Sequence, residues 1–211
     1  MRIRHLAPCL VAALLCSCVG TSLKQTWKSP DYRGGPVGKV AAVAVDERGD
    51  VRRAFENRFV SQLQKQGTPA VPTYNLLSLA EIKADKSAAA ERLRAAGADT
   101  VLIVRLVDSS FSYGETRLDS APWRPYDSWY GYYTVAFAGM GTTYGSLKQK
   151  VRLETSLFDL KTSKPIWSGL TDTVTAYDTD RVAEIDKIVA KVLGAMRKDG
   201  VIPEANNPSN H

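Results

Sequence analysis

The residue best placed to do chemistry is Cys18, which lies at the end of a short apolar stretch near the N-terminus. Arg2 and Arg4 give the chain a basic start, and residues 6–15 are apolar over about the length of a signal-peptide core. This stretch is too short to span a bilayer. The pattern predicts that residues 1–17 are a cleaved signal peptide, after which the Cys18 thiol becomes the acceptor for acylation.

The sequence around this cysteine, Leu15-Cys16-Ser17-Cys18, resembles the lipobox of bacterial lipoproteins. The resemblance implies a diacylglycerol joined to the Cys18 sulfur by a thioether, and a further acyl chain such as palmitate on its amino group. Several acyl chains anchor a protein stably, whereas one chain is marginal. Val19 follows the cysteine in place of an aspartate, which by the sorting rule of enteric bacteria implies the outer membrane. The alternative is an ordinary secretory signal cleaved at another position.

Histidine and cysteine are missing from most of the chain, and this excludes whole classes of active site. Cys9, Cys16 and His5 lie in the predicted signal, and His211 is the last residue. Ser-His-Asp catalysis, Cys-His catalysis and the usual zinc sites all need these residue types. We therefore expect no catalytic residue, no metal and no cofactor in the domain, and no disulfide within it.

Carboxylates could still support chemistry, because glycan cleavage needs only two of them. The acidic residues to consider in the last third of the chain are Glu154, Asp159, Asp172, Asp178 and Asp180. Their positions on strands, at a hairpin end and before a helix favour structural roles. A carboxylate-based glycan hydrolase is therefore the least favoured function.

The charge pattern does not indicate a nucleic-acid partner. The net charge is +6, and basic residues alternate with acidic ones, as in Arg52 and Arg53 near Glu56, which is typical of a solvated surface. Arg105 differs because it lies inside an apolar strand. It could recognise a buried ligand, although such an arginine more often lies at a strand end or pairs with a neighbouring acid.

Residues 109–146 form an aromatic-rich segment that holds more than half of the aromatic side chains in the chain. Tyr and Trp are favoured at protein interfaces and membrane interfaces, and their faces also stack on sugar rings. We predict a partner-binding surface made of Trp123, Tyr126, Trp129, Tyr130, Tyr132 and Tyr133. The alternative is one further strand near residues 132–137, with the rest of the segment packed on the domain as a loop.

The elements that must position this segment follow from hydrophobic periodicity and from turn residues. We predict strands at 39–45, 70–74, 100–107, 151–159 and 166–174, and helices at 50–66, 78–96 and up to residue 198. Gly67, Gly97 and Gly200 are predicted to end the helices. Asp50 is predicted to cap the first helix, and Ser78-Leu79-Ala80-Glu81 has the capping-box pattern. The order βαβαβ, an antiparallel hairpin and a closing helix predicts a single α/β domain, a mixed β-sheet with helices packed on it and a C-terminal helix.

The predicted domain is bounded by two segments of different composition. Residues 18–38 are predicted to be a lipidated tether. Because this segment contains Trp27 and Tyr32, we expect part of it to pack against the domain. Residues 39–202 form the α/β periplasmic domain. Residues 203–211 are a polar tail that we expect to be disordered.

Several short motifs together resemble a family of proteobacterial outer-membrane lipoproteins with a domain of unknown function. The motifs are Thr26-Trp27, Pro30, Tyr32, Gly34-Gly35-Pro36, Lys39-Val40, Phe55-Glu56, Phe59, Gly97-Ala98-Asp99 and Pro165-Ile166-Trp167-Ser168. The layout is also distantly similar to the periplasmic domains of the curli-secretion lipoprotein and of lipoproteins that activate penicillin-binding proteins. The second similarity concerns the order of elements alone, and function does not transfer from fold.

These observations predict an outer-membrane-anchored lipoprotein whose domain faces the periplasm, is not an enzyme and binds an envelope protein partner. Its contacts would be the membrane, through the lipid anchor, and that partner, with peptidoglycan as a further candidate. The alternative is a subunit of an oligomeric outer-membrane secretion channel in which residues 129–144 extend as membrane strands. Against it, each membrane strand needs roughly nine to eleven residues, and this segment offers at most one hairpin.

Overall fold

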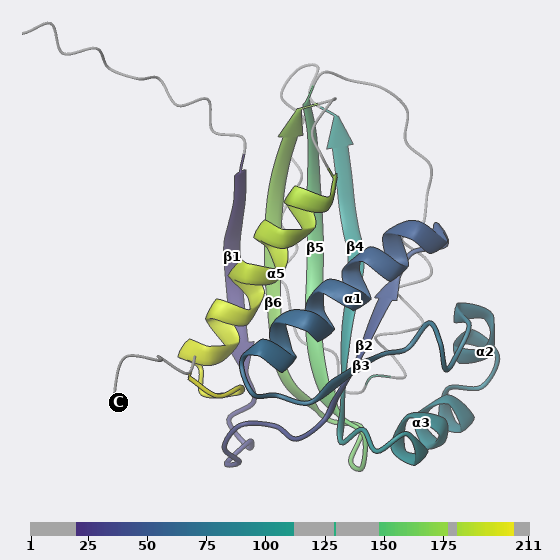
Figure 1. The fold of residues 1–211 in the computed structure, drawn as a ribbon. Helices are drawn as coiled ribbons and strands as arrows, with labels where there is room; N and C mark the ends of the chain where they lie inside the picture. The colour runs from purple at the N-terminus through teal and green to yellow at the C-terminus, as the bar shows by residue number, and fades with distance from the viewer. Residues whose placement is uncertain (1–19, 112–128, 130–147, 177–180, 205–211) are drawn as a thin grey trace, which may run out of the picture.

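A six-stranded mixed sheet forms the centre of the computed structural model, which describes residues 20–111, 129, 148–176 and 181–204. The strand order is β1-β6-β5-β4-β2-β3 (Figure 1). The strands are β1 (Gly20–Lys28), β2 (Val40–Val45), β3 (Ala70–Pro72), β4 (Thr100–Phe111), β5 (Lys148–Asp159) and β6 (Pro165–Ala176). This architecture confirms the predicted single α/β domain with a mixed sheet.

Parallel and antiparallel pairing meet at β4. On one side, β4 runs parallel to β2, which in turn runs parallel to β3. On the other side, β4, β5, β6 and β1 pair antiparallel in succession. The parallel half follows from the strand-helix-strand connections, and the antiparallel half from the short β5–β6 hairpin. Both were predicted from the order of the elements.

Helices cover both faces of the sheet. Helices α1 (Gly49–Lys65) and α5 (Arg181–Lys198) cross the same face, as Figure 1 shows. Buried side chains of α1 and α5 share one core cluster with alternate residues of the strands, including Leu102 and Leu157. Helices α2 (Leu79–Ala84) and α3 (Lys86–Ala95) contribute to a second cluster with the intervening strand residues, including Ile103 and Phe158.

Where the structure describes them, the helix ends agree with the predicted cap and stop residues, with one exception. Gly67, Gly97 and Gly200 have φ of 80°, 79° and 67°, which is the left-handed conformation that glycine adopts most easily after a helix. The capping box of α2 is present, with Ser78 and Glu81 bonding each other's backbone N–H. Asp50 was predicted to cap α1 but lies in its first turn, where its charge still favours the helix N-terminus.

The predicted tether 18–38 contains a strand of the sheet, which corrects that assignment. Strand β1 pairs along its length with β6, from Gly20 opposite Val174 to Lys28 opposite Trp167. Periodicity did not reveal it because the strand is largely half-buried or exposed, and a bulge breaks its alternation. The sheet therefore includes Gly20–Lys28, which lie within the predicted tether.

The two edges of the sheet carry features that discourage pairing with other chains. On β1, the exposed Lys24 lies at the bulge in the ladder with β6. The opposite edge, β3, has three residues and ends in Pro72, as expected for an edge strand. Short edges, bulges, lysine and proline all weaken edge-to-edge association.

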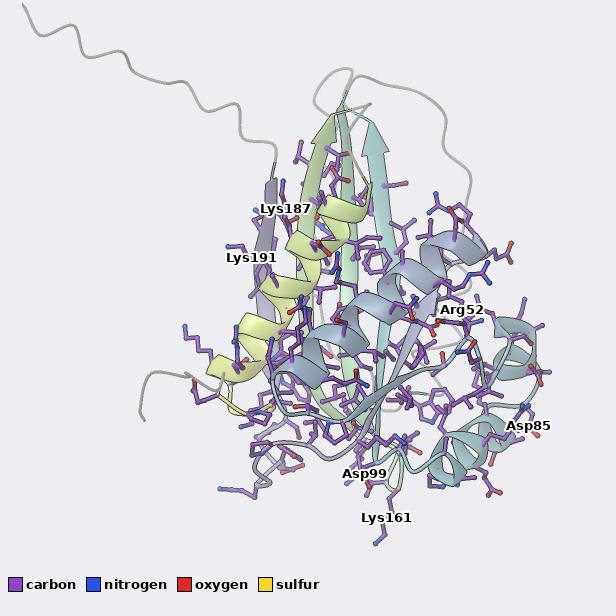
Figure 2. The ribbon with its side chains drawn as sticks, in the orientation of Figure 1. Arg52, Asp85, Asp99, Lys161, Lys187 and Lys191 are labelled. Carbon is purple, nitrogen blue, oxygen red and sulfur yellow. The ribbon has the colours of Figure 1, made fainter. Side chains whose placement is uncertain are left out.

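A fully buried carboxylate, Glu56, joins α1 to β2 and to the segment after β3. Its Oε2 accepts hydrogen bonds from the backbone N–H of Thr73 (2.6 Å) and Tyr74 (2.8 Å), and its Oε1 from Ala44 N–H (3.2 Å). Arg52 donates from Nε to the same Oε1 at 2.7 Å (Figure 2 labels Arg52). The sequence pattern placed this pair on a solvated surface, and the structure corrects that interpretation because Arg52 is only 7% exposed.

We expect Glu56→Ala to destabilise the fold by about 3–5 kcal/mol, because it removes the charge partner of the buried Arg52 guanidinium and an acceptor of three backbone N–H groups. Urea unfolding followed by circular dichroism measures this loss. Glu47→Ala is the control, since Glu47 is exposed and precedes the same helix, and it should change stability by less than about 0.5 kcal/mol. Equal unfolding curves for the two variants would contradict the proposed role of Glu56.

Candidate functional site

One row of paired residues crosses four strands near the start of β1. Gly20 lies opposite Val174, Val174 opposite Lys150, and Lys150 opposite Ser110. We call this the Gly20 row. Because neighbouring strands are about 4.8 Å apart, Gly20 and Ser110 lie roughly 15 Å apart. The aromatic segment is joined to the domain at this same end of the sheet, since β4 ends at Phe111 and β5 begins at Lys148.

A cavity of about 170 Å³ lies between α1 and α5, over strands β4, β5 and β6. We call it the α1–α5 cavity. Most of its lining residues are apolar, namely Ala44, Val45, Val51, Phe55, Val104, Leu106, Val151, Leu153, Ile185 and Ile188. Concave apolar surfaces of this kind are the usual places where small molecules and chain segments bind.

Six polar residues also line the α1–α5 cavity, namely Asp46, Arg48, Arg105, Thr173, Thr175 and Glu184. Thr173 and Thr175 contribute hydroxyl groups from β6, and both residues are largely buried. Asp46 and Arg48 pair with each other, because Arg48 donates from Nε (2.9 Å) and Nη2 (2.7 Å) to the two carboxylate oxygens of Asp46. The hydrogen bond to Asp46 raises the pKa of Arg48. Apolar residues still outnumber polar ones in the lining, so the cavity favours an apolar group over a charged one.

Strand β1 lies beside this cavity, because its second residue contacts a residue of the lining. Thr21 Oγ1 lies 3.1 Å from Thr173 Oγ1, and the two residues are cross-strand partners. Because Thr173 lines the α1–α5 cavity, the first residues of β1 lie one strand away from it. The start of the described chain and the cavity thus belong to one region of the surface.

The opposite face of the antiparallel half carries a buried ion pair. Arg105 donates from Nε (2.9 Å) and Nη2 (2.6 Å) to Glu154 Oε2, and the two residues face each other across β4 and β5. Glu154 is fully buried and Arg105 is 7% exposed. This confirms that Arg105 pairs with a neighbouring acid, which was one of the two alternatives from the sequence.

Two further acidic residues that were weighed for catalysis also have structural partners. Asp159 accepts hydrogen bonds from Thr162 N–H (2.6 Å) and Thr162 Oγ1 (2.9 Å) in the turn of the hairpin. Asp172 accepts from Arg152 Nε at 2.7 Å and forms an ion pair with Lys150 Nζ at 3.2 Å. Asp178 and Asp180 lie outside the described residues.

The pKa of Asp172 shows which of its interactions is stronger. Burial raises the pKa of this carboxyl, but the hydrogen bonds from Arg152 and Lys150 outweigh burial and lower it below the ordinary value of 3.8. Asp172 is therefore held in its charged form at neutral pH. A general acid for glycan cleavage needs a raised pKa, so this residue favours the structural interpretation.

Trp129 is the one predicted partner-binding residue within the described chain, and the structure places it in the core. Its side chain is 1% exposed and belongs to the cluster that contains Phe158 and Leu160. Its backbone N–H donates to Ser163 O at 3.3 Å, next to the β5–β6 turn. Trp129 is thus corrected from a surface contact to a core residue. Trp123, Tyr126, Tyr130, Tyr132 and Tyr133 lie outside the described residues, as does Cys18.

Comparison with known proteins gives distant structural similarities. No protein-family model matches the chain, and no curated protein matches it. The fold is similar to a PelC dodecamer structure from Paraburkholderia phytofirmans, at 15% identity over 82% of this chain and 94% of that chain, with a TM-score of 0.45. It is also similar to lipoprotein GNA1162 from Neisseria meningitidis, at 14% identity over 77% and 99% of the two chains, with a TM-score of 0.43.

Within residues 20–111, 129, 148–176 and 181–204, none of the helices combines the length and the hydropathy that a membrane span requires. In the same residues, no three His, Cys, Asp or Glu side chains come together as metal ligands.

Sequence reasoning missed the α1–α5 cavity. The helical residues that line it, such as Phe55 and Ile185, face the sheet and pack in or against its core cluster. Periodicity shows that a side chain faces the sheet, but it does not show where two helices leave a space between them.

We expect Trp129→Ala to lower the free energy of unfolding by about 3–5 kcal/mol, because it removes a large buried side chain and leaves a cavity. Urea denaturation measures the loss. The same substitution at Trp27, which is half-buried on the edge strand β1, is the matched control and should cost clearly less. If both variants unfold at the wild-type urea concentration, Trp129 does not belong to the core.

Proposed function

We propose that this protein is a lipid-anchored outer-membrane lipoprotein whose domain lies directly at the periplasmic surface of the membrane and binds an envelope protein partner there. The observation that carries the proposal is the start of β1 at Gly20, two residues after Cys18. With acylated Cys18 in the membrane, Val19 is the single residue between the anchor and the sheet.

This spacing limits how far the domain can move from the bilayer. Two extended residues span about 7 Å, which is less than the width of two strands. The Gly20 row would therefore face the membrane. The domain would meet its partner at the membrane surface and would not search the periplasm on a long tether.

The aromatic segment enters and leaves the domain at this same end, through Phe111 and Lys148. Its aromatic residues Trp123, Tyr126, Tyr130, Tyr132 and Tyr133 combine an apolar ring with a polar group. Such side chains are favoured at the headgroup level of membranes and at protein interfaces. The proposal assigns them to a partner that is itself at the membrane surface.

Exposed lysines on the β1 side of the domain support this orientation. Lys187 and Lys191 lie one turn apart on the side of α5 toward β1 (Figure 2). Lys24 is exposed on β1 itself. Lysines near a membrane surface attract anionic headgroups by about 1 kcal/mol each.

A non-enzymatic role agrees with the described side chains. Glu154, Asp159 and Asp172 have structural partners, and histidine and cysteine are missing between Val19 and Asn210. Binding is therefore the function that the residues of the domain favour.

The position of the domain can be measured with fluorescent labels, because the domain has no cysteine of its own. Ser110→Cys places a label in the Gly20 row, and Lys161→Cys places one in the turn at the far end of β5, where Lys161 is exposed. In vesicles containing brominated phospholipids, we expect strong quenching of the first label and little of the second.

Two controls make this experiment decisive. Ten Gly and Ser residues inserted between Val19 and Gly20 should reduce quenching of the Ser110→Cys label to that of the Lys161→Cys label. Cys18→Ala should release the protein from membranes altogether. Equal quenching at both labels would contradict the orientation, and membrane retention of Cys18→Ala with its signal removed would contradict the anchor.

We expect a triple alanine substitution of Trp123, Tyr130 and Tyr133 to reduce recovery of the envelope partner at least tenfold after cross-linking in cells. Thermal unfolding should stay within a few degrees of the wild type. Tyr74→Ala is the control, since the Tyr74 hydroxyl bonds to Asn57 on another surface, and it should leave recovery unchanged. Native mass spectrometry of the lipidated protein gives the copy number, and a ring of many copies would favour the channel subunit instead.

A further inference from the structure

We propose that the α1–α5 cavity holds part of an acyl chain attached to Cys18. The inference rests on the lipidation in the proposed function and adds a binding site for the lipid within the domain. Its basis is the lining of the cavity, its size and its distance from the start of β1.

The lining fits a hydrocarbon chain. Valine, leucine, isoleucine and phenylalanine side chains from two helices and two strands form most of it. Among the charged residues of the lining, Arg48 pairs with Asp46 and Arg105 pairs with Glu154, so a bound chain would leave these groups satisfied. Glu184, in the first turn of α5, is the remaining charged residue of the lining. A sugar or a charged ligand would instead need several polar groups directed at it.

The size fits a section of one chain. Apolar protein cavities of roughly 150 Å³ take up benzene, which has six carbon atoms. The α1–α5 cavity of about 170 Å³ therefore accommodates a similar number of methylene groups, with the remainder of the chain outside. Since stable anchoring takes two acyl chains, a three-chain anchor can place one in the cavity and still hold the membrane.

The position of Cys18 makes its own chain the favoured occupant. Thr21 bonds to Thr173, which lines the cavity, and Gly20 lies opposite Val174, between the lining residues Thr173 and Thr175. Cys18 is three residues before Thr21, and so within about 11 Å of it along the chain. An acyl chain on Cys18 is thus tethered beside the cavity at a high local concentration.

Photocross-linking of the full lipidated protein tests this site. Cells grown on a diazirine analogue of palmitic acid would incorporate it into the anchor, and the purified protein in vesicles would be irradiated. Mass spectrometry would then identify the peptides joined to the lipidated N-terminal peptide. We expect cross-links to peptides of β5 and α5 that contain Val151 and Ile188.

Variants that fill the cavity should abolish these cross-links. Val151→Trp adds a large ring from the sheet, and Ile188→Phe adds volume from α5. If one variant does not fold, the other still tests the site. Either folded variant should lose at least four-fifths of the cross-links. Val71→Trp is the matched control, because Val71 is a half-buried strand valine on the other core cluster, and it should retain them.

The outcomes separate this inference from the proposed function. An acylated N-terminal peptide that cross-links to bilayer lipids alone would overturn the cavity site while leaving the anchor intact. Cross-links from the anchor to a second protein would also overturn it. An N-terminal peptide without acyl groups would overturn both the inference and the lipoprotein assignment.

Discussion

The structure depends on β4, a central strand that must be covered on both faces. Val101 and Ile103 belong to one core cluster, and Leu102 and Val104 to the other, each at 4% exposure or less. Successive side chains of a strand point to opposite faces of the sheet. A strand that is apolar at every position therefore needs cover on both faces. Two helix layers are therefore required, and the parallel connections through α1 and α3 supply part of each.

Further along β4 the apolar run gives way to charge. Arg105 faces Glu154 on the neighbouring strand, inside the sheet. A buried ion pair contributes little net stability, because the cost of desolvation offsets much of the attraction. It does make a shifted register costly, since a slip of β5 by one residue would turn Glu154 to the opposite face and leave both charges without a partner. The pair thus helps to fix the long β4–β5 ladder, whose ends hold the aromatic segment.

The sequence predicted the elements whose signal is local and strong. The apolar run of β2, the glycine that ends α1 and the capping box of α2 each depend on a few neighbouring residues. It could not predict β1, a half-exposed edge strand with a bulge. It also misread Arg52 and Glu56, because opposite charges four residues apart look the same on a solvated helix face as in a buried network. Among the aromatic residues, nothing local separates Trp129 from its neighbours, and its burial comes from the hairpin beside it.

The difference between a tether and a strand after Cys18 changes the physical character of the site. A flexible tether of some twenty residues would let the domain sample a wide volume in any orientation, with a low effective concentration at each point. A strand that begins at Gly20 fixes both distance and orientation, because its hydrogen bonds to β6 continue from the first residues. Contacts at the Gly20 row would then be formed with little further loss of rotational freedom, which is the largest general cost of association. Under that constraint weak individual contacts, such as those of the exposed Lys24 and Lys187, would be sufficient, and the same closeness would bring the proposed lipid within reach of the α1–α5 cavity.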